Sequence, residues 1–269
     1  MVDLVHAPQM STRSAATEWD LNIRRPFTRA AGLSAGLTDA DLREPRYRQL
    51  FRGVYVDVRT PDSAEVRVEA ALQVFGQDAF ASHTSAARWL RIPIPIPIPI
   101  HATEHVTVRS LGQRRRREGI RAHVRSDARS IVVRGLRVSA IDQLFIELAG
   151  MLSLVDLVVV GDCVVRHGWI TREQLCAGCA LAGGAAAGMH ARAATGFVRS
   201  DVDSPMETRL RMLMVLAGLP EPVVNLTIRD VDGEPIRRFA LSWPSIRVIA
   251  EYDGRLHIQR ESQWNQDLE

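Results

Sequence analysis

The sequence predicts a mixed α/β (α+β) protein, and two observations lead to this fold class. Segments that open with an N-cap residue and repeat apolar residues at helical spacing alternate with short apolar runs typical of strands. Hydrophobic residues make up 46% of the chain, which is enough to build real cores. With 269 residues, the chain can hold one large domain or several small ones.

Arginine supplies all of the chain's basic charge outside histidine. The 34 lysine and arginine residues include no lysine, and the formal net charge is +3. The simplest explanation is a bias in codon usage. Whatever its origin, this composition excludes a Schiff-base lysine, the lysine of a P-loop and the lysine of a metal-dependent nuclease.

Nothing in the sequence indicates secretion or a membrane. Residues 1–20 are polar and mixed in charge, and the three cysteines cannot all pair within the chain. No apolar run approaches the roughly 18 residues of a membrane span. We therefore expect a cytoplasmic protein without a membrane partner.

The N-terminal part predicts a disordered leader over 1–22 and a winged-helix-like module over 23–60. Thr28 is a plausible N-cap for a first helix, a second helix covers 38–46, and residues 50–57 form a hairpin. Helix, turn, helix and hairpin is the order of a small winged helix. In this interpretation the second helix faces DNA, with Arg43, Arg46 and Arg48 near phosphates. The alternative is a small folded module whose arginines are merely solvated.

A mixed α/β middle domain is predicted over 61–200. Helices are expected at 64–76, 82–90 and, as two helices, 139–165; strands are expected at 105–108, 120–124 and 131–138. Residues 92–100 alternate isoleucine with proline, which removes ladder donors and predicts an extended, polyproline-like segment. Residues 171–198 are rich in alanine and glycine and weakly specified.

Within this domain, the segment 109–137 carries ten arginines against two acids. Arg114, Arg115, Arg116 and Arg117 are expected in a hairpin loop between the strands at 105–108 and 120–124, where they can reach a partner. Such a patch suits a nucleic-acid backbone, and its binding would weaken steeply with salt. The alternative is a solvated loop.

The cysteines and one histidine of the middle domain are interpreted as structural. Cys176 and Cys179 form a lone C-x-x-C, and Cys163 with His167 would be a poor second pair for zinc. His83 lies in a partly apolar helix and needs no chemical role.

The C-terminal part, 201–269, predicts a helix followed by three strands. Ser204 is the N-cap of the helix, Pro205 is its first residue and Glu207 completes a capping box. Strands are expected at 223–228, 237–243 and 246–252. Glu251 and Asp253 stand two apart on the last strand and share a face, an arrangement that can hold a divalent metal against a phosphodiester.

The motif Ser-Pro-Met-Glu207-Thr-Arg209-Leu, the three-strand meander and Glu251-Tyr-Asp253-Gly-x-x-His257 together resemble proteins related to very-short-patch-repair endonucleases. These belong to the PD-(D/E)XK superfamily, whose fold is restriction-endonuclease-like. Residues 27–30, 50–55 and 82–87 resemble the winged helix and following domain of actinobacterial AbiEi-type antitoxins. The resemblance thus spans both ends of the chain in the order that such proteins share.

This resemblance implies a DNA-associated protein of a toxin–antitoxin or defence system, with a toxin as a further partner. It assigns Glu207, Glu251 and Asp253 to a catalytic site that binds Mg²⁺ or Mn²⁺, and gives His257 the role of a base or a phosphate contact. The metal would lower the pKa of bound water and stabilise charge on the phosphate.

The chain departs from that family in two ways. Ala240 stands where the family has an aspartate on the second strand, and the family continues past Glu269 into another strand and helix. We therefore expect an incomplete nuclease-like sheet with impaired catalysis, in a protein whose role is DNA binding. The alternatives are an active metal-dependent endonuclease and a non-functional truncated remnant. Ordinary alternatives also remain for the residues themselves: capping for Glu207, turn acids for Glu251 and Asp253, and an exposed histidine for His257.

Overall fold

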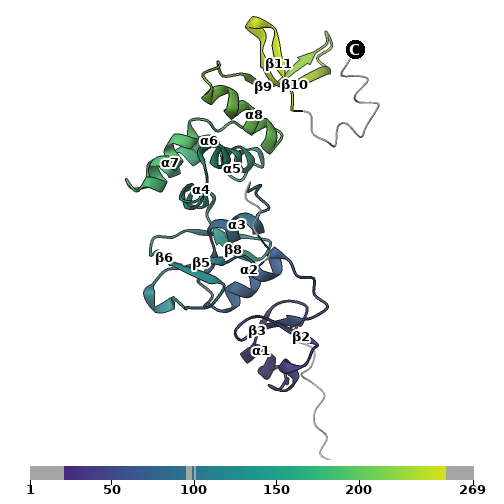
Figure 1. The fold of residues 1–269 in the computed structure, drawn as a ribbon, viewed down its shortest axis with the longest axis vertical. Helices are drawn as coiled ribbons and strands as arrows, with labels where there is room; N and C mark the ends of the chain where they lie inside the picture. Colours follow the sequence, from purple (N-terminus) through teal and green to yellow (C-terminus); the bar gives the residue numbers. More distant parts are fainter. Residues whose placement is uncertain (1–20, 95–98, 100, 253–269) are drawn as a thin grey trace, which may run out of the picture.

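The computed structural model describes residues 21–94, 99 and 101–252. Across these residues it contains eight α-helices and three sheets, so the protein is a mixed α/β protein as predicted. Figure 1 shows the elements following one another along the long axis, from a small N-terminal sheet to a C-terminal sheet. No helix in the described ranges is long and apolar enough to cross a membrane.

Three predictions fall on residues outside the described ranges. The leader over 1–22 lies outside them except for Leu21 and Asn22. Most of the isoleucine–proline repeat, 95–98 and 100, also lies outside them, as do Asp253 and His257.

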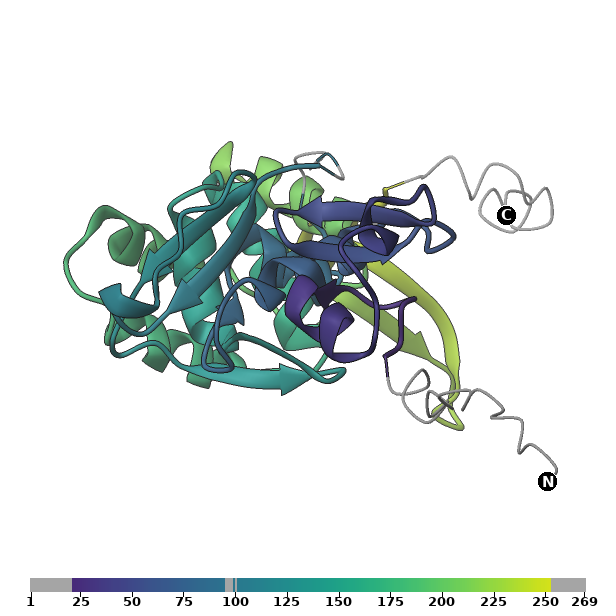
Figure 2. The same ribbon diagram turned by 90° about the horizontal axis from the view of Figure 1, so that it is seen from below.

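The N-terminal module is built on a three-stranded antiparallel sheet with the order β1-β3-β2. Its elements are β1 (Phe27–Thr28), α1 (Arg29–Ser34), β2 (Tyr47–Phe51) and β3 (Val54–Asp57). The Thr28 hydroxyl accepts a hydrogen bond from the Ala31 N–H at 3.1 Å, which confirms the predicted cap. Phe27 and Tyr47 pack edge to face in the small core, with ring centroids 5.8 Å apart. Figure 2 views the molecule from this end.

The predicted second helix of this module, over 38–46, is wrong. Only a 3₁₀ turn forms, over Asp41–Arg43. Thr38 and the Asp41 carboxylate bond each other locally, and such side-chain bonds compete with helical ones. Pro45 forces Glu44 into an extended conformation with a ψ of 152°, so the helix cannot continue. A recognition helix is therefore not present at these residues.

The middle of the molecule is a five-stranded sheet with the order β6-β5-β4-β8-β7. Its strands are β4 (Phe80–Ala81), β5 (Glu104–Val108), β6 (Ile120–Val124), β7 (Ser130–Val133) and β8 (Leu136–Ser139). Two helices accompany it, α2 (Ala64–Gln73) and α3 (His83–Trp89). Ala70 and Ala71 of α2 share an apolar cluster with Val106 and Val108 of β5 and with Phe51 of the N-terminal module, so the two parts share a core.

The predicted hairpin between β5 and β6 is also wrong, because the two strands are parallel. Glu104 lies opposite Ile120 and Val108 opposite Val124. The chain must therefore return along the full length of β5 before β6 begins, and residues 109–119 make this return with one 3₁₀ turn at Leu111–Gln113. We call residues 109–119 the arginine crossover, since they hold Arg114–Arg117.

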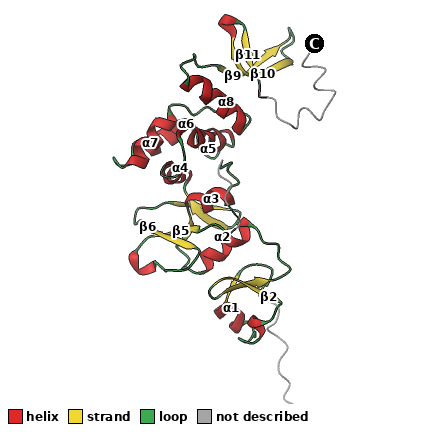
Figure 3. Cartoon of the chain, viewed as in Figure 1, coloured by secondary structure: helices red, strands yellow, loops and turns green. Residues whose placement is uncertain are grey.

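Helices fill the space between the five-stranded and the C-terminal sheets (Figure 3). They are α4 (Ile141–Ala149), α5 (Leu154–Arg166), α6 (Arg172–Ala180), α7 (Ala186–Thr195) and α8 (Pro205–Leu216). Leu144 and Leu148 of α4, Leu157 of α5 and Met212 of α8 are fully buried in one apolar core. The segment 171–198 thus forms two helices, since Thr171 and Gln174 make a capping box at the start of α6 and the abundant alanine favours a helix.

A buried ion pair fastens α8 to α5. The Arg211 guanidinium, with none of its side chain exposed, donates to Asp162 at 3.0 Å and to Glu221 at 3.1 Å. Asp162 also accepts from the Thr208 hydroxyl at 2.8 Å and from the Arg199 N–H at 2.7 Å. Helix α8, which the sequence assigns to the C-terminal part, therefore belongs to the helical core by packing.

The C-terminal sheet has the predicted meander, with the order β11-β10-β9 and antiparallel pairing throughout. Its strands are β9 (Val223–Arg229), β10 (Pro235–Trp243) and β11 (Val248–Ala250). Several apolar side chains on it are exposed, among them Ile228, Ile236 and Ile249. Leu241 of β10 is fully buried.

Candidate functional site

Glu207 is the predicted helix ligand of the nuclease-like site, and its carboxylate accepts hydrogen bonds that cap the N-terminus of α8. One carboxylate oxygen accepts the Ser204 hydroxyl at 2.9 Å and the other accepts the Asp203 N–H at 3.0 Å. The Glu207 N–H in turn donates to the Ser204 hydroxyl at 3.2 Å. Both carboxylate oxygens thus serve the start of α8, as the ordinary interpretation of this residue expects.

Glu251 and the position that lacks an acid are neighbours. The Ala240 N–H donates to Glu251 Oε1 at 3.0 Å, and Leu241 pairs with Ala250 across β10 and β11. An acid at position 240 would thus lie beside Glu251, as the resemblance requires, but alanine supplies no ligand. Glu207 and Glu251 belong to no group of three metal-binding side chains in the described part of the chain. The Mg²⁺ or Mn²⁺ site therefore stays a prediction that depends on Asp253.

The predicted DNA contacts of the N-terminal module are largely paired with carboxylates. Arg46 Nε lies 3.9 Å from Asp57, whose side chain is fully buried, and an Arg48 terminal nitrogen lies 3.8 Å from Asp62. Arg43 is exposed on the 3₁₀ turn. These contacts reduce the charge of Arg46 and Arg48 only in part, since Arg59 donates directly to the same Asp57 carboxylate at 2.8 Å.

The arginines of the crossover are placed differently. Arg114, Arg115 and Arg116 are exposed, and together with Arg121 of β6 they line a groove of about 1120 Å³. We call this the arginine groove; His105 and His123 also line it. Within the described residues, no carboxylate forms an ion pair with any of these four arginines. Arg117 does not line the groove; its side chain donates to the Arg116 carbonyl at 3.1 Å.

Three histidines meet where the arginine groove borders the sheet. One ring nitrogen from each of His83, His105 and His123 lies within 4.8 Å of the other two. His105 Nδ1 and His123 Nε2 are 3.1 Å apart. The rings of His83 and His123 stack, with centroids 4.0 Å apart and planes 16° from parallel. This group, the histidine cluster, is the one set of three potential metal ligands among the residues that the structure describes.

The parallel pairing of β5 and β6 brings two of these histidines together. His123 lies opposite Thr107, two residues beyond His105, so both histidines are on the same face of the sheet. The third arrives from the neighbouring strand β4, since the Ser82 N–H donates to the His105 carbonyl at 3.0 Å and His83 follows directly. His83 has a φ of 51°, an uncommon left-handed conformation for a non-glycine residue.

Burial keeps the three imidazoles neutral at physiological pH. Burial chiefly, and then the neighbouring histidines and Arg121, lower the pKa of His83 to about 3 and that of His105 to about 4. Burial and the charges of Arg121 and Arg114 lower the pKa of His123 as well. Neutral imidazole is the form that binds a metal ion.

Glu147 of α4 supports the cluster from the side of the helices. Its carboxylate accepts the His83 N–H at 3.0 Å and lies 3.6 Å from His83 Nδ1. The Ser139 hydroxyl and the Gln143 amide also donate to it, at 2.9 Å and 2.8 Å. Burial raises the pKa of Glu147, and these donors oppose the rise.

No pattern in the sequence predicts this cluster. The sequence alone indicates a structural role for His83 and does not single out His105 or His123. Each histidine comes from a different strand or strand end, and no spacing in the sequence links them. The available signal was weak: a histidine inside each of two apolar strands that flank an arginine-rich connection.

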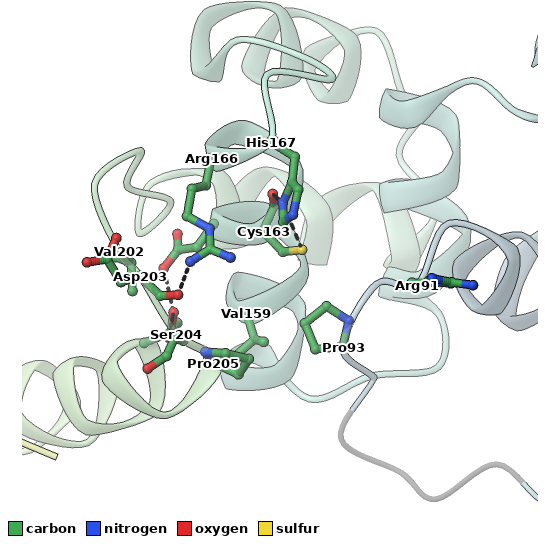
Figure 4. Close-up of a pocket in the computed structure, with 12 residues that line it drawn as sticks. Arg91, Pro93, Val159, Cys163, Arg166, His167, Val202, Asp203, Ser204 and Pro205 are labelled. Atoms are coloured by element: carbon green, nitrogen blue, oxygen red, sulfur yellow. Dashed lines mark hydrogen bonds between the residues drawn. The ribbon is translucent and has the colours of Figure 1, made fainter. Parts of the chain in front are cut away.

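A second pocket, shown in Figure 4, lies between α5 and the start of α8 and has a volume of about 260 Å³. Cys163 Sγ lies 3.6 Å from His167 Nδ1 in it, and that same nitrogen also lies 2.8 Å from the Cys163 carbonyl. Burial raises the pKa of the Cys163 thiol, so the reactive thiolate is disfavoured. Burial likewise raises the pKa of Cys179 to about 12. Neither cysteine has the environment of a nucleophile.

No protein-family model matches this chain, and no curated protein is significantly similar to it.

Proposed function

We propose that this protein binds DNA through the arginine groove, in a role related to toxin–antitoxin or defence systems. The observation that carries the proposal is the set of four arginines, Arg114, Arg115, Arg116 and Arg121, which line one open groove without a carboxylate partner in the described residues. A groove with unneutralised positive charge attracts a phosphate backbone, because binding releases the counterions of the nucleic acid.

The chemistry of arginine supports a phosphate ligand in particular. The guanidinium presents a planar fork of donors that matches two phosphate oxygens and stays charged at every physiological pH. Arg115 donates to the Gly112 carbonyl at 3.2 Å with one terminal nitrogen, which orients the side chain and leaves its other donors free. Exposure on the crossover allows these side chains to adjust to a backbone without unfolding the sheet.

The groove supports DNA binding better than the N-terminal module does. The module has only the 3₁₀ turn where a recognition helix would lie, and two of its three predicted contacts are paired with Asp57 and Asp62. Catalysis is not part of this proposal, because Glu207 is occupied by capping and Ala240 offers no ligand beside Glu251.

The test compares two variants that each lose three arginines. Arg114→Ser, Arg115→Ser and Arg116→Ser together remove most of the groove's charge; Arg43→Ser, Arg46→Ser and Arg48→Ser remove the same charge from the N-terminal module. Binding of a fluorescently labelled DNA duplex is followed by anisotropy in a buffer with EDTA, and circular dichroism checks the fold of each variant.

We expect the groove variant to lose affinity at least about tenfold, since each lost phosphate contact also loses counterion release. The module variant should bind within a small factor of the unaltered protein. Equal binding by the groove variant and the unaltered protein would contradict the proposal, and loss confined to the module variant would favour the winged-helix interpretation.

A further inference from the structure

We propose that His83, His105 and His123 bind a divalent transition-metal ion, with zinc as the ion that suits the ligands best. This inference goes beyond the proposed DNA binding and does not depend on it. It also differs from the carboxylate site that the sequence predicts at the other end of the chain, in its ligands, its position and its metal.

The separations within the cluster suit a single ion. With zinc–nitrogen bonds of about 2.0–2.1 Å and tetrahedral angles, two ligand nitrogens lie about 3.3 Å apart. His105 Nδ1 and His123 Nε2 are already 3.1 Å apart, and all three ligand atoms lie within 4.8 Å of one another. Ligation requires the stacked rings of His83 and His123 to turn toward a common point, a side-chain rotation that leaves the strands in place.

Each ring of the cluster can offer one nitrogen lone pair to a cation. A neutral imidazole carries one N–H donor and one lone pair, so three rings supply three metal ligands and keep three N–H groups for other partners.

A hydroxyl and a carboxylate lie next to the His83 ring, as outer partners of a metal ligand commonly do. Metal-binding histidines commonly give their second nitrogen to a carboxylate, which fixes the ring and raises its basicity. His83 Nδ1 lies 3.1 Å from the Ser82 hydroxyl, and the Glu147 carboxylate, held by Ser139 and Gln143, lies 3.6 Å from the same nitrogen. The left-handed backbone of His83, with a φ of 51°, is local strain of the kind that concentrates at binding sites.

The ligand set selects the class of metal. Imidazole suits zinc, cobalt, nickel and copper, whereas magnesium prefers oxygen ligands. Three protein ligands leave a tetrahedral ion one further position, the pattern of catalytic rather than structural zinc sites. Because His105 and His123 also line the arginine groove, that position is open to the groove, where water or a phosphate oxygen can supply the fourth ligand.

The test titrates cobalt and zinc into the full chain after chelator treatment and without nucleic acid. Cobalt(II) reports tetrahedral binding by visible absorption, and calorimetry gives the zinc affinity and stoichiometry. The variants are His123→Gln, whose side chain is only half-buried on an outer strand of the sheet, and His83→Asn, since asparagine tolerates the left-handed backbone. His101→Gln is the matched control, because His101 is exposed and lies outside the cluster.

We expect one equivalent of metal in the unaltered protein and in His101→Gln. His123→Gln and His83→Asn should bind at least about 100-fold more weakly, and Glu147→Gln about tenfold more weakly, the range found for the loss of outer partners. Unchanged affinity in His123→Gln, or no tetrahedral cobalt spectrum in the unaltered protein, would overturn the inference.

Two further measurements keep the test decisive. Thermal melting and circular dichroism establish that each variant is folded. X-ray absorption on the zinc-loaded, unaltered protein counts imidazole ligands without any substitution; a sulfur shell would assign the metal to the cysteines and refute the site. Since DNA binding is measured with EDTA and metal binding without DNA, the failure of either proposal is visible on its own.

Discussion

Raising the salt concentration should weaken DNA binding by a factor set by the charge of the arginine groove. Four arginines line the groove. If each neutralises one phosphate, the slope of log affinity against log salt is about −0.9 × 4, or about −3.6. Between about 50 and 200 mM salt, the affinity should then fall about 150-fold.

The variant that lacks Arg114, Arg115 and Arg116 should respond far less to salt. Only Arg121 remains in the groove, so the slope should be about −0.9 and the loss over the same salt range about 3.5-fold. Fluorescence anisotropy at five or more salt concentrations measures both slopes.

Equal slopes for the two proteins would mean that the groove arginines release no counterions and do not bind the backbone. A flatter slope for the variant that lacks Arg43, Arg46 and Arg48 would equally contradict binding in the groove. That outcome would assign the phosphate contacts to the N-terminal module despite its carboxylate partners.

Three further predictions concern stability. Arg211→Met should lower the free energy of unfolding, measured in urea, by about 3–5 kcal/mol, because it leaves the buried Asp162 carboxylate without its cation. A loss under about 1 kcal/mol would mean that water reaches the ion pair. Hydrogen bonds from Arg59 hold the pKa of Asp57 below its usual range. The ionised Asp57 carboxylate therefore stabilises the fold above about pH 4, and this stabilisation is lost as the pH falls further and the carboxylate is protonated. Asp57→Asn should therefore lower the melting temperature at pH 7 and make the melting temperature fall less steeply toward pH 3. If the melting temperatures of the variant and the unaltered protein fall in parallel with pH, Asp57 is not the cause of the acid sensitivity. Gly161→Ala should lower the free energy of unfolding by about 1–3 kcal/mol, because an added Cβ would overlap a methyl group of Val198 in the segment after α7. An unchanged midpoint of thermal or urea unfolding would show that this segment shifts freely.

Local chemistry in the sequence predicted the elements whose ends are fixed by their own residues. Ser204 and Glu207 cap α8, and Thr28 caps α1, through bonds that span three or four residues. The error at 38–46 also has a local cause, since Pro45 and the Thr38–Asp41 bonds end the turn before a helix forms. Pro45 stands inside the predicted range, so the sequence itself contains the residue that prevents a helix through 46.

The direction of β6 and the histidine cluster could not be predicted in this way. An 11-residue connection such as 109–119 serves a long hairpin loop as well as a crossover, and only the register against β5 decides between them. That same register brings His105 and His123 together, so the error over the hairpin also hid the cluster. The arginine-rich segment was found because charge density is visible without knowledge of pairing.

The ion pair between Arg211 and Asp162 decides where this chain can be divided. Only 3% of the Asp162 side chain is exposed in the intact protein, and a cut near residue 200, at the boundary that the sequence indicates, would remove its partners Arg211 and Thr208. The C-terminal fragment would carry Arg211 away from its partner and expose Met212 of the shared core. Fragments meant to isolate the groove and the histidine cluster should therefore keep α8 and Glu221, and end within or after the β9 strand.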